Sequence, residues 1–172
     1  SALDHLSEAE LERGEKYHFR VDRLRFFAAR LALRRLLGAR VGVDPSGLRF
    51  GYDSHGKPML PRSHTGTRVH FNLSHSQDMA VFAFSREYEL GIDIEKVRPI
   101  PEADEIARRL FSPKDLEEYV ALNPAENVRG FVRLWTRHEA LAKATGVGSI
   151  SPRIIQDART MHCEFNQRGH RC

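Results

Sequence analysis

Hydrophobic positions near the amino terminus follow a helical repeat. Five apolar side chains recur at alternating spacings of four and three residues: Tyr17, Val21, Leu24, Ala28 and Leu31. This spacing predicts one long helix over residues 15–37 that buries these side chains, with Gly38 as its stop. A short helix should precede it, because Ser7 and Glu10 have the spacing of a capping box.

The middle of the chain changes to short apolar runs separated by turn residues. Four expected strands cover residues 48–52, 69–73, 79–84 and 90–94. A helix should begin at Ser112, since Pro113 fits a first turn, and another should cover 125–145 and stop at Gly146. Helices on both sides of a run of strands indicate an α+β fold, not a doubly wound sheet.

Composition narrows the class of protein. With 172 residues and 41% hydrophobic side chains, the chain can form one domain or two small halves. A net charge of +4 favours an anionic ligand or an acidic partner. No apolar run could span a bilayer and the first residues have no secretory pattern, so we expect a cytoplasmic protein that acts without a membrane. Cys163 and Cys172 both lie in the tail, which is no disulfide framework.

Two segments carry the candidate chemistry. In the run Gly-Ile-Asp-Ile-Glu at 91–95, Asp93 and Glu95 would share one side of the expected strand. On the last helix, Glu139 and Lys143 are one turn apart. Converging in space, these groups could hold a hard divalent cation against a phosphorylated substrate. The simpler alternative is a pair of strand-end acids and an ordinary surface Glu–Lys bridge, and we favour the metal.

Four segments, in this order, resemble a known family. They are Gly56-Lys57-Pro58, Phe71-Asn72-Leu73-Ser74-His75-Ser76, Gly91-Ile92-Asp93-Ile94-Glu95 and the run from Trp135 to Lys143. Together they resemble the motifs of the larger, pseudo-dimeric class of 4′-phosphopantetheinyl transferases, the surfactin-synthetase-activating class. The resemblance implies two similar α/β halves, with short antiparallel sheets packed on long helices. Residues 1–90 would form the first half, 91–150 the start of an abbreviated second half, and 151–172 an uncertain tail for which disorder is favoured.

The resemblance also implies an activity. Enzymes of this family transfer the 4′-phosphopantetheine arm of coenzyme A to a serine of an acyl or peptidyl carrier protein and release adenosine 3′,5′-bisphosphate. We therefore expect a Mg²⁺-dependent holo-[acyl-carrier-protein] synthase type of transferase. Its partners would be coenzyme A and an acidic carrier protein, without nucleic acid, and the protein would be a monomer. The residues leave open which carrier it serves, in fatty-acid or secondary-metabolite synthesis, and whether Mn²⁺ replaces Mg²⁺.

Residue roles follow from the matched motifs. Asp93, Glu95 and Glu139 would bind the metal, Glu139 would also take the serine proton, and Lys143 would stabilise charge on the phosphate. The coenzyme A contacts would come from Arg25, Lys57, Ser74 and His75. His138 stands where the family usually has lysine, and a protonated histidine would partly replace that cation. Three other residues are expected in structural roles: Arg30, Arg34 and Trp135.

Two other functions compete with the transferase. A shortened second half could leave a non-catalytic module that binds coenzyme A or a carrier protein. A nucleic-acid-binding protein or metal nuclease is suggested only by charge and carboxylates, and the chain has no RNA or DNA motif. The tail residues His162, Cys163, His170 and Cys172 lack the spacing of a zinc module, so we do not expect a metal there.

Overall fold

The computed structural model describes residues 2–61, 66, 68–146, 164–166 and 169–171. Its helices are η1 (Ala2–His5), α1 (Glu8–Glu15), α2 (Arg20–Val41), η2 (Pro45–Gly47), α4 (Ala103–Leu110), α5 (Pro113–Val120) and α6 (Asn127–Thr145). Its strands are β1 (Gly51–Tyr52), β2 (Pro58–Met59), β3 (His70–Ser76), β4 (Met79–Ser85), β5 (Glu164–Asn166) and β6 (Gly169–Arg171). The strands pair as three antiparallel hairpins, which confirms the expected α+β class.

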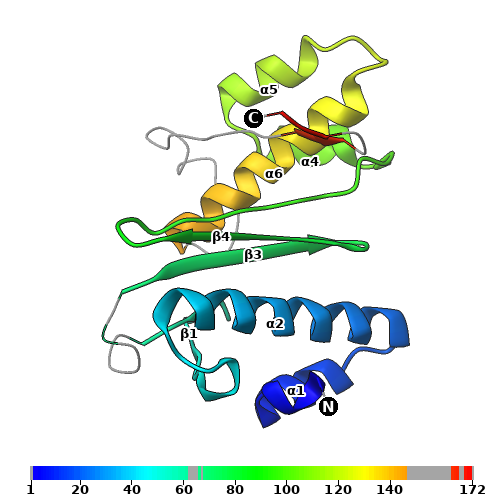
Figure 1. Ribbon diagram of the computed structural model, residues 1–172. Coiled ribbons are helices and arrows are strands. Elements are labelled where there is room, and N and C mark those ends of the chain that lie inside the picture. The colour runs from blue at the N-terminus through cyan, green and yellow to red at the C-terminus, as the bar shows by residue number, and fades with distance from the viewer. Residues whose placement is uncertain (1, 62–65, 67, 147–163, 167–168, 172) are drawn as a thin grey trace.

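The β3–β4 hairpin lies at the centre of the molecule (Figure 1). Its register runs from His70 opposite Ser85 to Ser76 opposite Met79. Helix α2 covers one side of the hairpin, and α6 crosses the other side (Figure 1). The chain that follows β4 runs back between the hairpin and α6, so residues 90–96 are placed between two elements that are far apart in the sequence (Figure 1).

Both ends of α2 differ from the prediction. Ser7 forms a capping box with Glu10 at the start of the short helix α1, as predicted. Helix α2 begins at Arg20, five residues later than the expected start at residue 15. Helix α2 continues past Gly38 to Val41 and ends where Gly42 adopts a left-handed conformation with φ 69°. The predicted stop was wrong because the second of two glycines takes the left-handed position while Gly38 stays helical.

The predicted buried stripe of α2 is also wrong. Val21 and Leu24 are 49% and 55% exposed. The side that is buried carries Phe26, Phe27, Ala29, Arg30, Leu33, Arg34 and Leu37. Two of these residues are arginines, because Glu10 of α1 lies against them and its Oε2 is 2.7 Å from Arg34 Nη2. A pattern of apolar positions cannot include an arginine that is buried by an ion pair with another helix. Both arginines form the expected structural ion pairs, with Glu10, although Arg30 also lines a pocket.

Two larger hydrophobic clusters hold the described residues together. One joins α2 to the hairpin through Leu33, Leu37, Leu48, Leu60, Val69 and Phe71. The other packs α4, α5 and α6 around Ala107, Phe111, Tyr119, Phe131, Val132 and Leu134. The first contains residues before position 90 and the second residues after it. The boundaries at 90/91 and 150/151 stay predictions.

The remaining expectations have mixed outcomes. Helix α6 ends at Gly146 as predicted, with φ 69°, and α5 starts at Pro113 after the Ser112 cap. Only Gly51–Tyr52 of the first expected strand pairs, and residues 90–94 form no strand. In the tail, only β5 and β6 are described, so the expected disorder there, and His162, Cys163 and Cys172, lie outside the described residues. None of the described helices combines the length and hydropathy needed to cross a bilayer.

Candidate active site

A pocket of about 580 Å³ brings together segments that are far apart in the sequence, from Arg13 to Gly146. Its wall includes Arg13, Tyr17, Phe26, Ala29 and Arg30 from the first helices, residues 53 and 55–58 from the β1–β2 turn, residues 72–75 of β3, and Asp93, Glu95, Trp135, Glu139, Ala142, Lys143 and Gly146. Every predicted site residue except Arg25 lines this pocket. Residues from all four family motifs therefore meet around one cavity.

Residues 91–96, which include Asp93 and Glu95, are held on β3 by hydrogen bonds to side chains instead of the backbone-to-backbone hydrogen bonds of a sheet. Every second amide of this segment donates to a polar side chain of β3. The bonds run from the amides of Ile92, Ile94 and Lys96 to the oxygens of Asn72, Ser74 and Ser76, over 2.9, 3.4 and 3.1 Å respectively. The predicted strand is absent because side-chain oxygens take the place of strand carbonyls, so the segment lies across the side chains of β3.

Gly91 lets this segment approach α6 closely. A Cβ atom at this position would lie 1.9 Å from the carbonyl oxygen of Ala140 and 2.6 Å from the amide nitrogen of Ala144. Both neighbours are helix backbone, which cannot move aside as a flexible side chain could. A glycine is therefore required where the carboxylate segment packs on α6.

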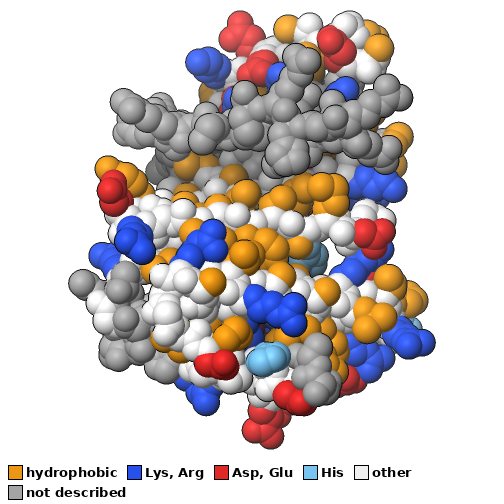
Figure 2. Space-filling model, in the orientation of Figure 1, with side chains coloured by type: hydrophobic (Ala, Val, Ile, Leu, Met, Phe, Trp, Pro, Cys, Tyr) orange, Lys and Arg blue, Asp and Glu red, His pale blue; other side chains and the backbone are white. Residues whose placement is uncertain are grey.

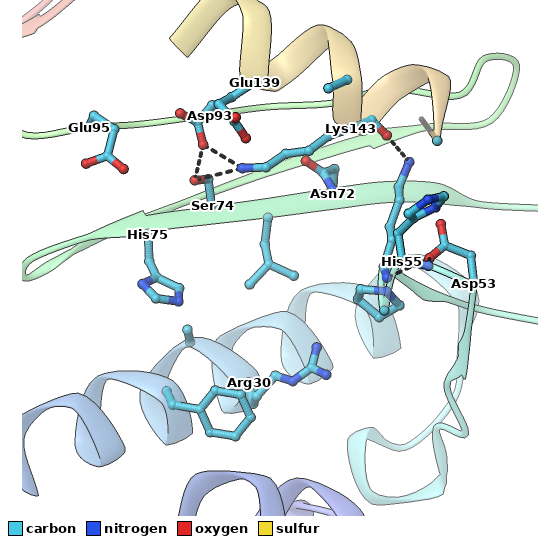
Figure 3. A pocket seen from close by; sticks show the side chains of 18 of the residues that line it. Arg30, Asp53, His55, Asn72, Ser74, His75, Asp93, Glu95, Glu139 and Lys143 are labelled. Atoms are coloured by element: carbon cyan, nitrogen blue, oxygen red, sulfur yellow. Dashed lines mark hydrogen bonds and ion pairs between the residues drawn. The ribbon is translucent and has the colours of Figure 1, made fainter. Parts of the chain in front are cut away.

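Asp93 lies at the centre of the polar contacts in the pocket (Figure 3). Its Oδ1 accepts hydrogen bonds from Ser74 Oγ at 2.8 Å and from Lys143 Nζ at 2.5 Å. Lys143 also lies 3.3 Å from Ser74 Oγ, so the three side chains form one closed group. The side chain of Asp93 is only 6% exposed, and its Oδ2 is buried with no hydrogen-bond partner among the described residues. An unpaired buried carboxylate oxygen is costly unless another group binds it.

The other two carboxylates extend this acidic region. Glu139 lies beside Asp93, and Glu95 stands farther along β3, where its Oε2 accepts from Ser76 Oγ at 2.9 Å (Figure 3). Burial raises the pKa of Glu139, and repulsion from Asp93 and, less strongly, Glu95 raises it further against the opposing effect of Lys143. Negative charge is thus concentrated here beyond what one lysine balances.

The donor set fits a divalent cation. Among the described residues, no group of three or more His, Cys, Asp and Glu side chains is already gathered closely enough to hold a metal. The three acids nevertheless share one pocket, the free Oδ2 of Asp93 needs a partner, and carboxylate oxygens are the ligands that Mg²⁺ prefers. Movements of the Glu95 and Glu139 side chains would be needed to bring all three together.

The residues expected to contact coenzyme A have different surroundings. Lys57 donates from Nζ to the carbonyl oxygens of Leu90, at 3.1 Å, and Lys143, at 2.8 Å, so it ties the carboxylate segment to the end of α6. His75 is exposed and points to the α2 side of β3, opposite to Ser74 (Figure 3). The hydroxyl of Ser74 is engaged with Asp93.

Arg25 lies outside the pocket wall. Its guanidinium pairs with Asp78 in the β3–β4 turn, through Nε at 3.0 Å and Nη2 at 2.8 Å, and with Asp22 at 3.1 Å. The guanidinium that was expected to contact coenzyme A is thus already paired with two carboxylates.

His138 does not supply the cation that the lysine of the family would. Its ring is 2% exposed, stacks on Phe111 with centroids 4.9 Å apart, and lies with Nε2 2.9 Å from Asp115 Oδ2. Burial lowers its pKa despite the opposing carboxylate, so the ring favours the neutral form. The expected replacement of lysine by protonated histidine is wrong here, because residue 138 faces the α4–α6 core while Glu139 faces the pocket.

Sequence reasoning missed several residues of the pocket wall. Trp135 was expected in the core; it stacks on Phe131 at 6.1 Å and also lines the pocket. Asn72 lies two residues before Ser74, and that period-two spacing was the signal that both face α6. No sequence signal marked four further polar or aromatic residues of the wall as pocket residues, because they reach it only through the tertiary fold: Arg13, Tyr17, Asp53 and His55.

Comparison with known proteins agrees with this geometry. The family model described as "4'-phosphopantetheinyl transferase, N-terminal" matches residues 1–87. The model described as "4'-phosphopantetheinyl transferase superfamily" matches residues 89–170. The chain belongs to the 4′-phosphopantetheinyl transferase family. The pocket therefore lies where residues from both matched regions meet.

Three relatives illustrate the range of the family. HetI of Nostoc sp. is 39% identical over 155 residues, which are 90% of this chain and 65% of the relative. Sfp of Bacillus subtilis is 30% identical, covering 91% and 70%, and the mouse L-aminoadipate-semialdehyde dehydrogenase-phosphopantetheinyl transferase is 32% identical, covering 86% and 50%. A Synechocystis relative is covered over 58% of its length. The chain thus spans about three fifths of the length of several relatives.

Proposed function

We propose that this protein transfers the 4′-phosphopantetheine arm of coenzyme A to a serine of an acyl or peptidyl carrier protein and releases adenosine 3′,5′-bisphosphate. The observation that carries the proposal is the meeting of Ser74, Asp93, Glu139 and Lys143, from three distant segments, in one pocket. The relatives support the same activity, because their names describe phosphopantetheinyl transferases. The expected holo-[acyl-carrier-protein] synthase type is not resolved, and similarity to Sfp leads us to propose the Sfp-like subtype.

The proposed chemistry is displacement at phosphorus, in which the protein contributes position and charge. Asp93, Glu95 and Glu139 would hold Mg²⁺, and the bound ion would neutralise the pyrophosphate of coenzyme A. Glu139 takes the proton of the attacking serine, and its raised pKa brings it closer to the working range of a general base. Lys143 balances the charge of Asp93 before the substrate binds and can donate to phosphate oxygens afterwards.

Partner and surface features complete the proposal. The net charge of +4 suits the acidic surface expected of a carrier protein. Lys and Arg side chains are spread over the face seen in Figure 2, without one dominant basic patch. We propose that the protein acts as a cytoplasmic monomer, without nucleic acid or membrane.

The decisive experiment measures the mass of a carrier protein after incubation with coenzyme A, Mg²⁺ and this protein. We expect the carrier to gain the mass of the phosphopantetheine arm. Asp93→Asn keeps the size of the side chain but removes its charge, and should slow transfer at least about a hundredfold, or roughly 2.7 kcal/mol in the barrier. Asp44→Asn is the control. Asp44 accepts the amide of Ser46 at the start of η2 and does not line the pocket, so its substitution should leave transfer unchanged.

The same assay separates the transferase from the non-catalytic alternative. Folded protein that binds coenzyme A in calorimetry but modifies neither an acyl nor a peptidyl carrier protein would contradict the transferase proposal. That result would favour a binding module.

A further inference from the structure

Three polar side chains of β3 share the side that faces α6. Asn72, Ser74 and Ser76 are two residues apart, so they point the same way along the strand. Each of them accepts one amide of the carboxylate segment, from Ile92, Ile94 and Lys96 in turn. The spacing of the acceptors on β3 therefore matches the spacing of the donors on the facing segment.

The two serines also contact the carboxylates themselves. Ser74 Oγ donates to Asp93 Oδ1 at 2.8 Å, and Ser76 Oγ donates to Glu95 Oε2 at 2.9 Å. A hydroxyl has one proton and two lone pairs, so a single serine can donate to a carboxylate and accept the next amide together. Each serine thus fixes a carboxylate and the backbone that follows it.

Few other contacts hold the far end of this segment, around Glu95. Among the described residues, no backbone-to-backbone hydrogen bond joins residues 91–96 to β3. Its other contacts lie in its first half: Gly91 packs on α6, and Lys57 donates to the carbonyl oxygen of Leu90. Lys143 Nζ also contacts the carbonyl oxygen of Ile92 at 3.4 Å and Asp93 Oδ1 at 2.5 Å. The position of Glu95, at the far end, consequently depends on Ser76 more than on any regular secondary structure.

We propose that Asn72 and Ser76 are positioning residues of the active site, which fix Asp93 and Glu95 and so set the affinity of the pocket for its divalent cation. The inference rests on the proposed function, since it assigns these acids to the cation. Both residues act through the carboxylate segment, not through the reacting atoms. Groups that hydrogen-bond to metal ligands typically change metal affinity tenfold or more when they are removed.

The first test follows amide hydrogen exchange by NMR in the metal-free protein and so does not depend on the function. The amides of Ile92, Ile94 and Lys96 should exchange slowly, and those of Asp93 and Glu95 quickly. Ser76→Ala should speed exchange at Lys96 about tenfold and leave Ile92 unchanged, whereas Asn72→Ala should do the reverse. Equal exchange along the wild-type segment, or no change at Lys96 in Ser76→Ala, would overturn the proposal.

The second test measures Mn²⁺ binding by electron paramagnetic resonance, with Mn²⁺ as a probe of the site. Ser76→Ala should weaken binding about tenfold, and Ser76→Thr, which keeps the hydroxyl, should restore it. The matched control is Ser85→Ala, since the Ser85 hydroxyl also accepts backbone amides, from Glu87 and Tyr88, but does not contact the carboxylate segment. In transfer assays, Ser76→Ala should raise the apparent KM for Mg²⁺ about tenfold while kcat at saturating Mg²⁺ and KM for coenzyme A stay unchanged.

The outcomes separate this inference from the proposed function. Wild-type transfer with unchanged Mn²⁺ affinity in Ser76→Ala would overturn the positioning role and leave the transferase intact. A wild-type protein that binds no Mn²⁺ and modifies no carrier would overturn both the proposed function and the link to cation affinity.

Discussion

Two kinds of buried acid occur in this protein, and they differ in how well their charge is balanced. Glu10, 1% exposed, lies 2.7 Å from Arg34 and 3.5 Å from Arg30. Asp115, 3% exposed, accepts from Ser112 and Arg137 and pairs with His138. In the pocket, by contrast, Lys143 is the one cation that forms an ion pair with any of the three acids, as far as the described residues go.

The contrast separates acids whose charge is balanced by neighbouring side chains from acids whose charge is not. Where an acid is structural, the surrounding helices supply enough donors to offset the cost of burying its charge. Oε1 of Glu10 has no hydrogen-bond partner among the described residues, but it lies 3.5 Å from Arg30 Nε in an ion pair. In the pocket, Oδ2 of Asp93 also has no hydrogen-bond partner there, one lysine faces three acids, and the pKa of Glu139 is raised. Such uncompensated charge in a cavity is a physical sign of a functional site.

The largest expected effect on stability comes from removing a buried acid that forms ion pairs. Glu10→Ala should lower the free energy of unfolding by about 3–5 kcal/mol, because Arg34, 1% exposed, would stay buried without its counter-charge. Equilibrium urea unfolding measures this change. Glu12→Ala, an exposed neighbour on the same helix, should change stability by less than about 0.5 kcal/mol. If both variants lowered the free energy of unfolding by a similar small amount, the ion pairs of Glu10 would not stabilise the fold.

The sequence motifs selected residues that the fold brings together, whereas the packing of the helices was predicted less well. Lys57, Ser74, Asp93 and Glu139, one from each motif, line one pocket, and their roles there stay predictions. The capping box at Ser7 and the stop of α6 at Gly146 were predictable from local backbone chemistry alone.

The errors have a common physical cause, which is long-range pairing of polar groups. Arg34 is buried because Glu10, 24 residues away in the chain, balances it. Residues 91–96 form no strand because side chains of β3, about twenty residues earlier, accept their amides. His138 turns to the core because Asp115 of α5 accepts it there, and its neighbour Glu139 points about 100° away around the helix. Such partners cannot be read from local spacing.

A smaller loss of stability should appear when the pH is lowered, because His138, beside Asp115, takes up a proton. Burial holds the pKa of His138 below its ordinary 6.5, and its Nδ1 is buried without a partner among the described residues. The unfolded chain therefore takes up this proton first, so the stabilisation is present above pH 6.5 and is lost as the pH falls toward the folded-state pKa.

Urea unfolding at a series of pH values tests this effect. One histidine can contribute at most about 1.4 kcal/mol per pH unit to the slope. We expect the stability of His138→Gln, which cannot titrate but can still donate to Asp115, to fall less between pH 6.5 and 5.5 than that of the wild type. Equal slopes would show that His138 is not the group responsible.

The smallest expected effect comes from Glu139 in the pocket, and its dependence on pH has the opposite sign to that of His138. The pKa of Glu139 is raised above its ordinary 4.5, so the folded protein loses stability as the pH rises from 4.5 through the folded-state pKa. Glu139→Gln removes this repulsion and should be more stable than the wild type at pH 7 by less than about 1 kcal/mol, because the half-buried group is partly screened by water. The difference should vanish near pH 4, in thermal unfolding followed by circular dichroism. If Mg²⁺ binds as proposed, it should raise the melting temperature of the wild type at pH 7 more than that of Glu139→Gln, which lacks this carboxylate. A variant less stable than the wild type at pH 7 would place Glu139 among the structural acids, with Glu10 and Asp115.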